Sequence, residues 1–229
     1  MQALALRLRA IPARVRLGRL TWTITIALSW LIIYNTLPYF TFGTHYAFLV
    51  EKGPVAGDGW WRTSFYAHIS GGMLCLATGP LLFWNALLRG RPAVHRWIGR
   101  LYVLSVLGWA GPAGVYLSLY AKGGSIGRFC FLLQVIGWWG TTAVGLQAIL
   151  ARRVPDHLRW MIRSYALALS AVFFRISQVA LLATTGMKDD LNYGLSLWLS
   201  LAASVVAGEM MIRRRGLAPG TAKPNGGAA

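Results

Sequence analysis

Long apolar segments alternate along the chain with short breaks that contain glycine, proline and charged residues. Hydrocarbon about 30 Å thick is spanned by roughly 20 predominantly apolar helical residues, and six segments satisfy that length. They are residues 20–40, 60–84, 98–121, 127–150, 160–186 and 193–212. The pattern predicts an all-α integral membrane protein with six transmembrane helices, in which spans 2–5 form a four-helix core.

The composition supports a membrane protein and argues against a soluble one. Of the 229 residues, 56% are apolar and 13% are charged, and the mean hydropathy is +0.51. The 6 acidic residues are too few for the polar surface of a soluble domain. Cys75 and Cys130 lie within apolar segments and form no Cys-x-x-Cys motif, so we expect buried, reduced thiols.

Lysine and arginine are distributed unevenly between the two predicted sides of the membrane. Seventeen of the 23 lie in the N-terminal segment, in the C-terminal segment, or in the second and fourth connections with their helix ends. Five lie on the other side, and Arg175 lies within a span. Cytoplasmic loops collect basic residues, so we expect both termini to be cytoplasmic, in a bacterial inner membrane. Topology thereby explains the net charge of +17, and no nucleic-acid partner is expected.

The chain divides into a basic start, a membrane domain and a polar tail. Residues 1–19 hold five arginines and no acid, which is typical of a cytoplasmic segment on anionic lipid, although a mitochondrial transit peptide has a similar composition. Residues 20–215 form the six-helix domain. Residues 216–229, rich in Gly, Ala and Pro, are expected to be a disordered cytoplasmic tail.

Two stretches of the sequence resemble each other at a constant offset. Asn85 precedes His95 by ten residues, and Gln147 precedes His157 by the same ten, which gives an offset of 62. The simplest explanation is a tandem two-helix repeat, with spans 2–3 duplicated as spans 4–5. Two spans restore the original direction, so the copies would be parallel, and the two histidines would lie at equivalent cytoplasmic helix ends.

This histidine pair makes haem ligation a candidate chemistry. A b-type haem needs two imidazoles at one depth on facing helices, and His95 and His157 satisfy the depth condition. Arg100 and Arg163, about one turn deeper, are candidate partners for the haem propionates. Histidine beside arginine at a membrane interface also binds lipid phosphate, so the same residues are consistent with a site for anionic lipid at the cytoplasmic rim.

Other polar residues within the spans suggest a second site. His68 lies about two turns into span 2 from the outer side, where it could pair with His45, and Gln134 stands on span 4 where a symmetric second ligand would be. Arg175 lies near mid-membrane, where an unpaired charge is costly, so we expect it to be buried in the bundle interior. Its candidate partners are Gln178, Gln134 and Tyr116, and it either binds a substrate, a quinone or a propionate, or organises the bundle.

The polar motifs resemble a known family. The resemblance covers about residues 60–180 and is carried by His68–Gly72, Gly79-Pro80, His95–Val103 and His157–Ala166. These motifs resemble the bacterial membrane-protein family called domain of unknown function 2306, which implies a multi-span bacterial protein and no particular activity. A looser architectural similarity is to transmembrane b cytochromes and ferric reductases, although span 4 lacks the histidine that would pair with His68.

These observations leave three functional hypotheses open. The first is a b-type haem protein that transfers electrons to an unidentified redox partner or quinone, with His95 and His157 as iron ligands. The second is a haem-free binding or transport protein for an amphipathic anion or lipid, with Arg175 as a contact. The third is a structural or assembly subunit of a membrane complex. Nucleotide-binding loops, serine-hydrolase motifs and intramembrane carboxylate pairs are absent from the sequence, and whether the protein is an enzyme stays undecided.

Overall fold

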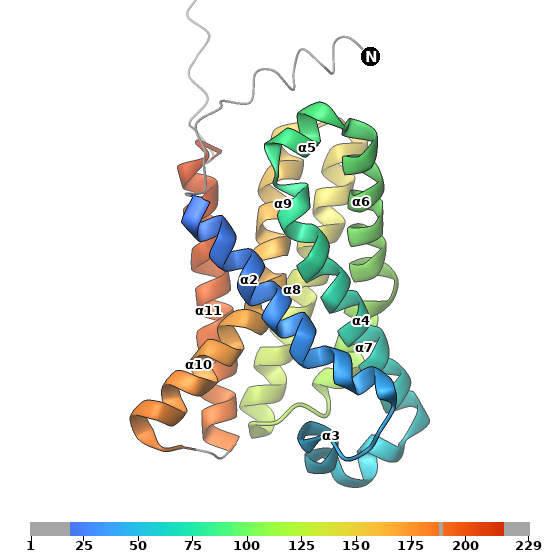
Figure 1. Cartoon of the computed structure of the whole chain (residues 1–229), viewed down its shortest axis with the longest axis vertical. Coiled ribbons are helices and arrows are strands. Elements are labelled where there is room, and N and C mark those ends of the chain that lie inside the picture. Colours follow the sequence, from blue (N-terminus) through green and yellow to red (C-terminus); the bar gives the residue numbers. More distant parts are fainter. Residues whose placement is uncertain (1–18, 188–189, 218–229) are drawn as a thin grey trace, which may run out of the picture.

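The computed structural model describes residues 19–187 and 190–217, and every regular element in these ranges is a helix. The predicted basic start and polar tail lie almost entirely outside the described residues. The elements, shown in Figure 1, are α2 (Arg19–Thr36), η1 (Leu37–Thr41), α3 (Ala47–Lys52), η2 (Gly53–Gly57), α4 (Gly59–Leu82), α5 (Asn85–Gly90), α6 (Pro92–Leu104), the π-helical η3 (Ser105–Ala110), α7 (Gly111–Ser118), α8 (Gly124–Leu150), α9 (Val154–Ala168), α10 (Ser170–Thr185) and α11 (Asp190–Arg214).

Six helical stretches in the described residues are long and apolar enough to cross a membrane, which confirms the predicted number of spans. They are Leu20–Thr41, Gly59–Leu82, Pro92–Ser118, Gly124–Leu150, Val154–Thr185 and Asp190–Arg214. Spans 3 and 5 begin six residues earlier than predicted. Pro92 and Pro155 occupy the first turns of α6 and α9, where the missing N–H of proline costs no helical hydrogen bond.

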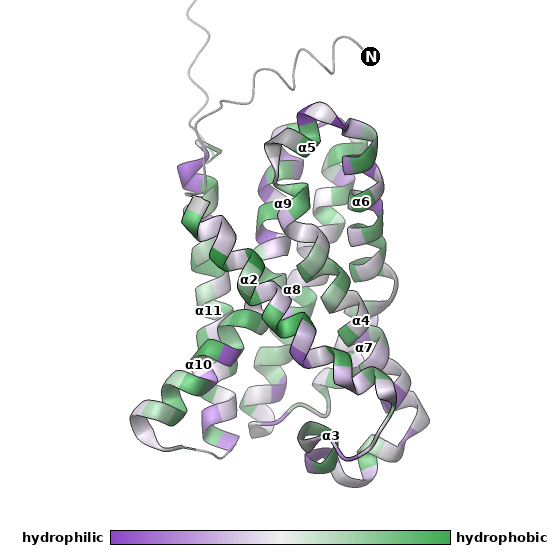
Figure 2. Ribbon diagram, viewed as in Figure 1, coloured by the Kyte–Doolittle hydropathy of each residue, from purple (hydrophilic) through white to green (hydrophobic). Residues whose placement is uncertain are grey.

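The surface has the polarity that a bilayer requires. Figure 2 shows hydrophilic residues gathered toward the two ends of the molecule, with apolar residues between them. Large apolar side chains such as Trp30, Ile136 and Val206 are exposed. In water such exposure would be unfavourable, whereas lipid tails solvate these groups. The protein is therefore an integral membrane protein, with the bilayer in contact with its apolar faces.

The two ends of the bundle differ in the connections that they carry. The start of α2, the α5 segment, the α8–α9 turn and the end of α11 lie together at one end, here called the inner end (Figure 1). The turns after α7 and α10 lie at the opposite end with α3, here called the outer end. The inner end holds the connections with most of the basic residues. This grouping is the one that the charge distribution predicts, and the assignment of the inner end to the cytoplasm stays a prediction.

Toward the inner end, spans 2–5 form a four-helix bundle. Helix α4 packs against α6 and α7, α7 against α8, and α8 against α9, while α9 also contacts α4. Helices α6 and α9 thus occupy opposite corners, as do α4 and α8. Helix α11 packs against α8 and α9, and α2 lies across α4 (Figure 1).

Apolar side chains and a hydroxyl cluster hold the centre of this bundle together. Cys75, Val106 and Trp138 belong to its buried apolar core, and both cysteines are buried free thiols, as predicted. A second set is polar: Ser164 of α9 lies 2.9 Å from the Tyr102 hydroxyl of α6 and 2.7 Å from the Thr142 hydroxyl of α8. These three buried hydroxyls tie three helices together and satisfy one another where water is absent.

Spans 3 and 5 are interrupted near their middle. In span 3 the π-helical segment η3 separates α6 from α7, and in span 5 the helix breaks at Leu169, between α9 and α10. After that break α10 packs against α11 and contacts α2 (Figure 1). The outer half of the molecule therefore differs from the predicted core, because the fifth span leaves the bundle. Helices α6 and α9 do begin 62 residues apart, but the sequence repeat stays a prediction.

Candidate functional site

The inner histidines occupy matching positions on two parallel helices. His95 is the fourth residue of α6 and His157 is the fourth residue of α9, and these helices stand at opposite corners of the bundle. His157 Nδ1 lies 2.8 Å from the Gly145 carbonyl oxygen. A carbonyl can only accept, so Nδ1 carries the proton and Nε2 of the neutral ring keeps a lone pair. His95 Nδ1 is buried and has no hydrogen-bond partner among the described residues.

The arginines expected near these histidines already have protein partners. Arg163 forms an ion pair with Glu209 of α11, with Nε 2.7 Å and an Nη 3.3 Å from its two carboxylate oxygens. The Arg100 guanidinium lies 4.8 Å from the centre of the Trp97 ring, on an exposed part of α6. The Arg163 guanidinium is therefore already paired with a carboxylate, whereas Arg100 keeps its N–H donors on an exposed part of α6.

His68 is held by an irregularity in the neighbouring span. The π-helical turn of η3 changes the backbone hydrogen-bond pattern, and the Ala110 carbonyl at its end accepts a 2.9 Å hydrogen bond from His68 Nδ1. Gly114 provides the space, because a Cβ there would lie 2.8 Å from the same nitrogen. The backbone thus fixes the proton on Nδ1 and leaves the opposite edge of the ring, with Nε2, free to accept.

On α8, Gln134 reaches the broken part of span 5. Its Nε2 donates to the Ser170 hydroxyl at the start of α10, which ties the break in span 5 to α8. Its Oε1 is buried and has no hydrogen-bond partner among the described residues. A buried carbonyl oxygen without a donor typically costs about 1–3 kcal/mol, and either a ligand donor or rotation of the amide toward the Ser170 hydroxyl would supply the missing hydrogen bond.

These side chains border a cavity of about 180 Å³. It lies where α10 departs from the bundle, and residues of α4, α8, α10 and α11 line it together with the last residues of α9. The polar members of its lining are His68, Gln134, Ser170 and Tyr193, and its aromatic members include Phe131, Trp138 and Phe174. The structure therefore brings the predicted residues His68 and Gln134 to one site, whereas His45 lies outside its lining.

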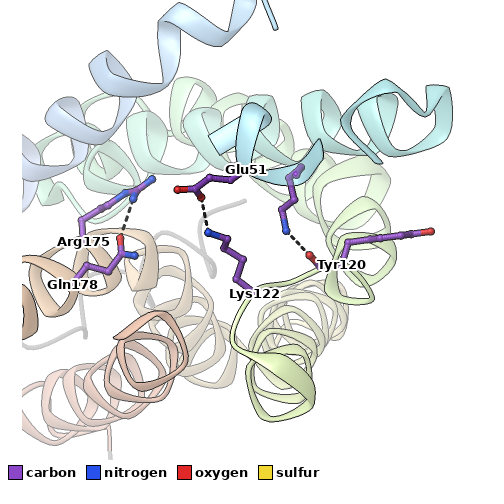
Figure 3. A network of polar contacts seen from close by, with 6 residues as sticks. Glu51, Tyr120, Lys122, Arg175 and Gln178 are labelled. Atoms are coloured by element: carbon purple, nitrogen blue, oxygen red, sulfur yellow. Dashed lines mark hydrogen bonds and ion pairs between the residues drawn. The ribbon is translucent and has the colours of Figure 1, made fainter. Parts of the chain in front are cut away.

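Arg175 is exposed on α10, and not buried in the bundle interior as the sequence suggested. The departure of α10 from the bundle is the reason, because it carries this side chain to the open side of the molecule. One guanidinium nitrogen donates to Gln178 Oε1 at 2.9 Å, and the guanidinium lies 5.7 Å from the Phe174 ring centre. Figure 3 shows the pair near the outer polar network.

That outer network joins α3 to the turn that follows α7. Lys122 forms a 2.6 Å ion pair with Glu51 (Figure 3), and Lys52 donates to the Tyr120 carbonyl. The pKa of Lys52 lies below its ordinary value, because burial disfavours the ammonium and because Lys122 and Arg128 repel it. A polar pocket of about 310 Å³ lies here, and its walls carry charges of both signs.

Sequence reasoning identified some of these residues and missed others. His68 and Gln134 stand out because they are polar within apolar spans. Ser170 and Tyr193 give no comparable signal, since serine and tyrosine are common in membrane helices. Ser170 reaches the cavity at the break after α9, and Tyr193 lines the cavity from α11.

The family comparison covers both the histidine pair and the cavity. The model of a family described as "Predicted membrane protein (DUF2306)" matches residues 65–212, which begin within α4 and end within α11. No curated protein and no solved structure matches the chain. Because the family match covers more than half of the sequence, the chain belongs to the DUF2306 family of predicted membrane proteins.

Proposed function

We propose that the protein is a transmembrane electron carrier that holds a b-type haem between His95 and His157. One observation carries the proposal: the two imidazoles occupy the same helical position, at the same end, on parallel helices at opposite corners of a four-helix bundle. Bis-histidine ligation requires two rings at one depth on facing helices. The equivalent positions of the two histidines and the arrangement of their helices support this assignment.

The hydrogen bonding of the two rings favours ligation further. The Gly145 carbonyl holds His157 in the tautomer whose Nε2 is a ligand, as backbone carbonyls do for many metal-binding histidines. The unpartnered, buried Nδ1 of His95 leaves this ring with unsatisfied bonding capacity. A bound iron porphyrin would supply a one-electron couple between its ferric and ferrous states.

Residues around the two histidines would determine the environment of the haem iron. The buried apolar cluster below the histidines keeps water from the bundle centre. Since Arg163 is paired with Glu209 and Arg100 is stacked on Trp97, the proposal relies on the two histidines and assigns no propionate contact. The alternative of an amphipathic-anion carrier loses Arg163 as a contact, because that guanidinium is paired with the Glu209 carboxylate.

Absorption spectroscopy tests this proposal directly. Protein expressed with added haem and purified in detergent should show a Soret band, with sharp α and β bands after dithionite reduction. His95→Ala and His157→Ala should each lose the bands, whereas His45→Ala, at an exposed outer position, should keep them. His95→Met, which retains a possible axial ligand, should keep a band at a shifted position.

A monodisperse but colourless wild-type protein would overturn the assignment. Unchanged spectra in both alanine variants would overturn it equally, since haem would then be held elsewhere. Size-exclusion profiles of the variants separate loss of haem from loss of the fold.

A further inference from the structure

The outer cavity has the chemistry of a binding site for a small ring. We propose that it binds a hydroquinone, a flat aromatic ring with a hydroxyl group at each of two opposite edges and an alkyl tail. This site lies in the outer half of the bundle and is separate from the His95/His157 pair, so the inference does not rest on haem binding. The volume of the cavity, its polar groups and its aromatic walls each support this class of ligand.

Two residues of the lining, His68 and Gln134, offer hydrogen-bond acceptors to a ligand. On α4, the Ala110 carbonyl keeps the proton of His68 on Nδ1, so the opposite ring nitrogen offers a lone pair. On α8, Gln134 donates one of its two amide N–H groups to Ser170, and its Oε1 has no donor among the described residues. Acceptors on two different helices of the lining are matched by a ligand with two donors, and the two hydroxyl groups of a quinol are such donors. A quinone carbonyl would face these atoms lone pair to lone pair.

The remaining walls suit an aromatic ring in size and character. The cavity of about 180 Å³ is slightly larger than an engineered apolar cavity of roughly 150 Å³ that holds benzene. Phe131, Trp138 and Phe174 contribute ring faces and edges to the lining, against which a flat ring packs well. Gly72, without a side chain, keeps the α4 wall open.

The position of the cavity admits a ligand with a tail. Ala171 belongs to the cavity lining and is exposed on α10. This helix lies away from the four-helix bundle (Figure 1). In a bilayer this side faces lipid, so an alkyl tail can remain in hydrocarbon while the ring enters. A phenol without an alkyl tail would gain no binding energy from this opening to the lipid.

Ligand binding to the detergent-purified full chain tests the inference. The probe is a decyl-substituted benzoquinol kept reduced under anaerobic conditions, and the measurement is isothermal titration calorimetry. The oxidised quinone with the same tail and decanol serve as comparison ligands. We expect saturable binding of the quinol, about tenfold weaker binding of the quinone, and only non-saturable partition of decanol.

Variants locate the site. Gln134→Leu removes one acceptor and should weaken quinol binding about tenfold. Gln147→Leu makes the same change on an exposed face of the same helix and should leave binding unchanged. Because His68→Ala removes the second acceptor but also leaves the Ala110 carbonyl unpaired, it should weaken binding and is checked for folding by size exclusion.

The outcomes separate this inference from the haem proposal. His95→Ala and His157→Ala should bind quinol like the wild type, whatever their absorption spectra. Equal affinities for quinol and quinone would overturn the acceptor argument. Wild-type affinity in Gln134→Leu, or saturable binding of decanol, would overturn the site itself.

Discussion

The inner and outer halves of the bundle both use glycine for close packing, but in the outer half a glycine also borders open space. Toward the inner end, glycine allows helices to touch: a Cβ on Gly79 would lie 1.9 Å from the Tyr165 ring, and one on Gly145 would lie 2.8 Å from Met161 Sδ. In the outer half, Gly72 lines the cavity, and a Cβ there would meet nothing within 4 Å. One glycine-rich helix, α4, thus contributes close contact at Gly79 and open space at Gly72.

The position of the fifth span explains this difference. Helix α9 stays within the bundle and packs on α8, whereas α10 leaves it for α11. A membrane helix gains little from hydrophobic burial against its neighbours, because lipid is equally apolar, so close packing and polar contacts decide where it lies. In the inner half packing dominates, and in the outer half the Gln134–Ser170 contact spans an incompletely filled interior.

The largest expected effect comes from adding a methyl group to the packed half. Gly79→Ala should lower the free energy of unfolding by about 2 kcal/mol, because the buried Tyr165 ring cannot move aside without disturbing its neighbours. For a chain of this length, that corresponds to roughly 4–8 °C in apparent melting temperature. Thermal stability in detergent, followed by the remaining monodisperse peak on size exclusion, measures it.

Gly72→Ala provides the matched control on the same helix. Its methyl group enters the cavity, and alanine favours a helix by about 1 kcal/mol over glycine, so stability should stay equal or rise slightly. The same variant should reduce quinol affinity by narrowing the cavity. If Gly72→Ala destabilises the protein as much as Gly79→Ala does, the contrast between a packed glycine and a glycine beside a cavity is wrong.

A smaller effect should follow from removing one hydroxyl of the buried cluster. Tyr102→Phe deletes the group that lies 2.9 Å from Ser164, and Ser164 keeps Thr142 as its partner. The expected cost is about 1 kcal/mol, or roughly 2–4 °C. Tyr116→Phe, toward the outer end, removes only a long 3.4 Å contact with Tyr120 and should have little effect. If Tyr116→Phe costs as much as Tyr102→Phe, the hydroxyl cluster has no special role.

The sequence predicts the six spans because hydropathy identifies runs of apolar residues long enough to cross the hydrocarbon of a bilayer. It misplaces the starts of spans 3 and 5, because Arg96 and Arg159 lower the local hydropathy, while the helix boundary is set by proline in the first turn. It also misses the break at Leu169. No proline or glycine lies between Arg163 and Arg175, so the break has no local signal and depends on contacts with other helices.

The site was predictable to the same limited extent. Histidine and glutamine within apolar spans are conspicuous, and His68 and Gln134 were therefore candidates. Their joint placement depends on the π-helical turn near Ala110 and on the departure of α10. The expected burial of Arg175 assumed a continuous fifth span, and the tertiary break removes that assumption.

The smallest expected effect concerns charge at the outer end, where the pKa of Lys52 lies below its ordinary value of 10.5 because of burial and the nearby Lys122 and Arg128. The folded state binds this proton less tightly than the unfolded state, so stability should rise as pH increases from the lowered pKa toward 10.5. The rise should be about 1–2 °C, because partial exposure screens the repulsion. Lys52→Gln should remove it, and Arg128→Gln should reduce it. The test is to measure the melting temperatures of the wild type and the variants between neutral and alkaline pH. An undiminished rise of the melting temperature in Lys52→Gln would assign the alkaline stabilisation to other groups.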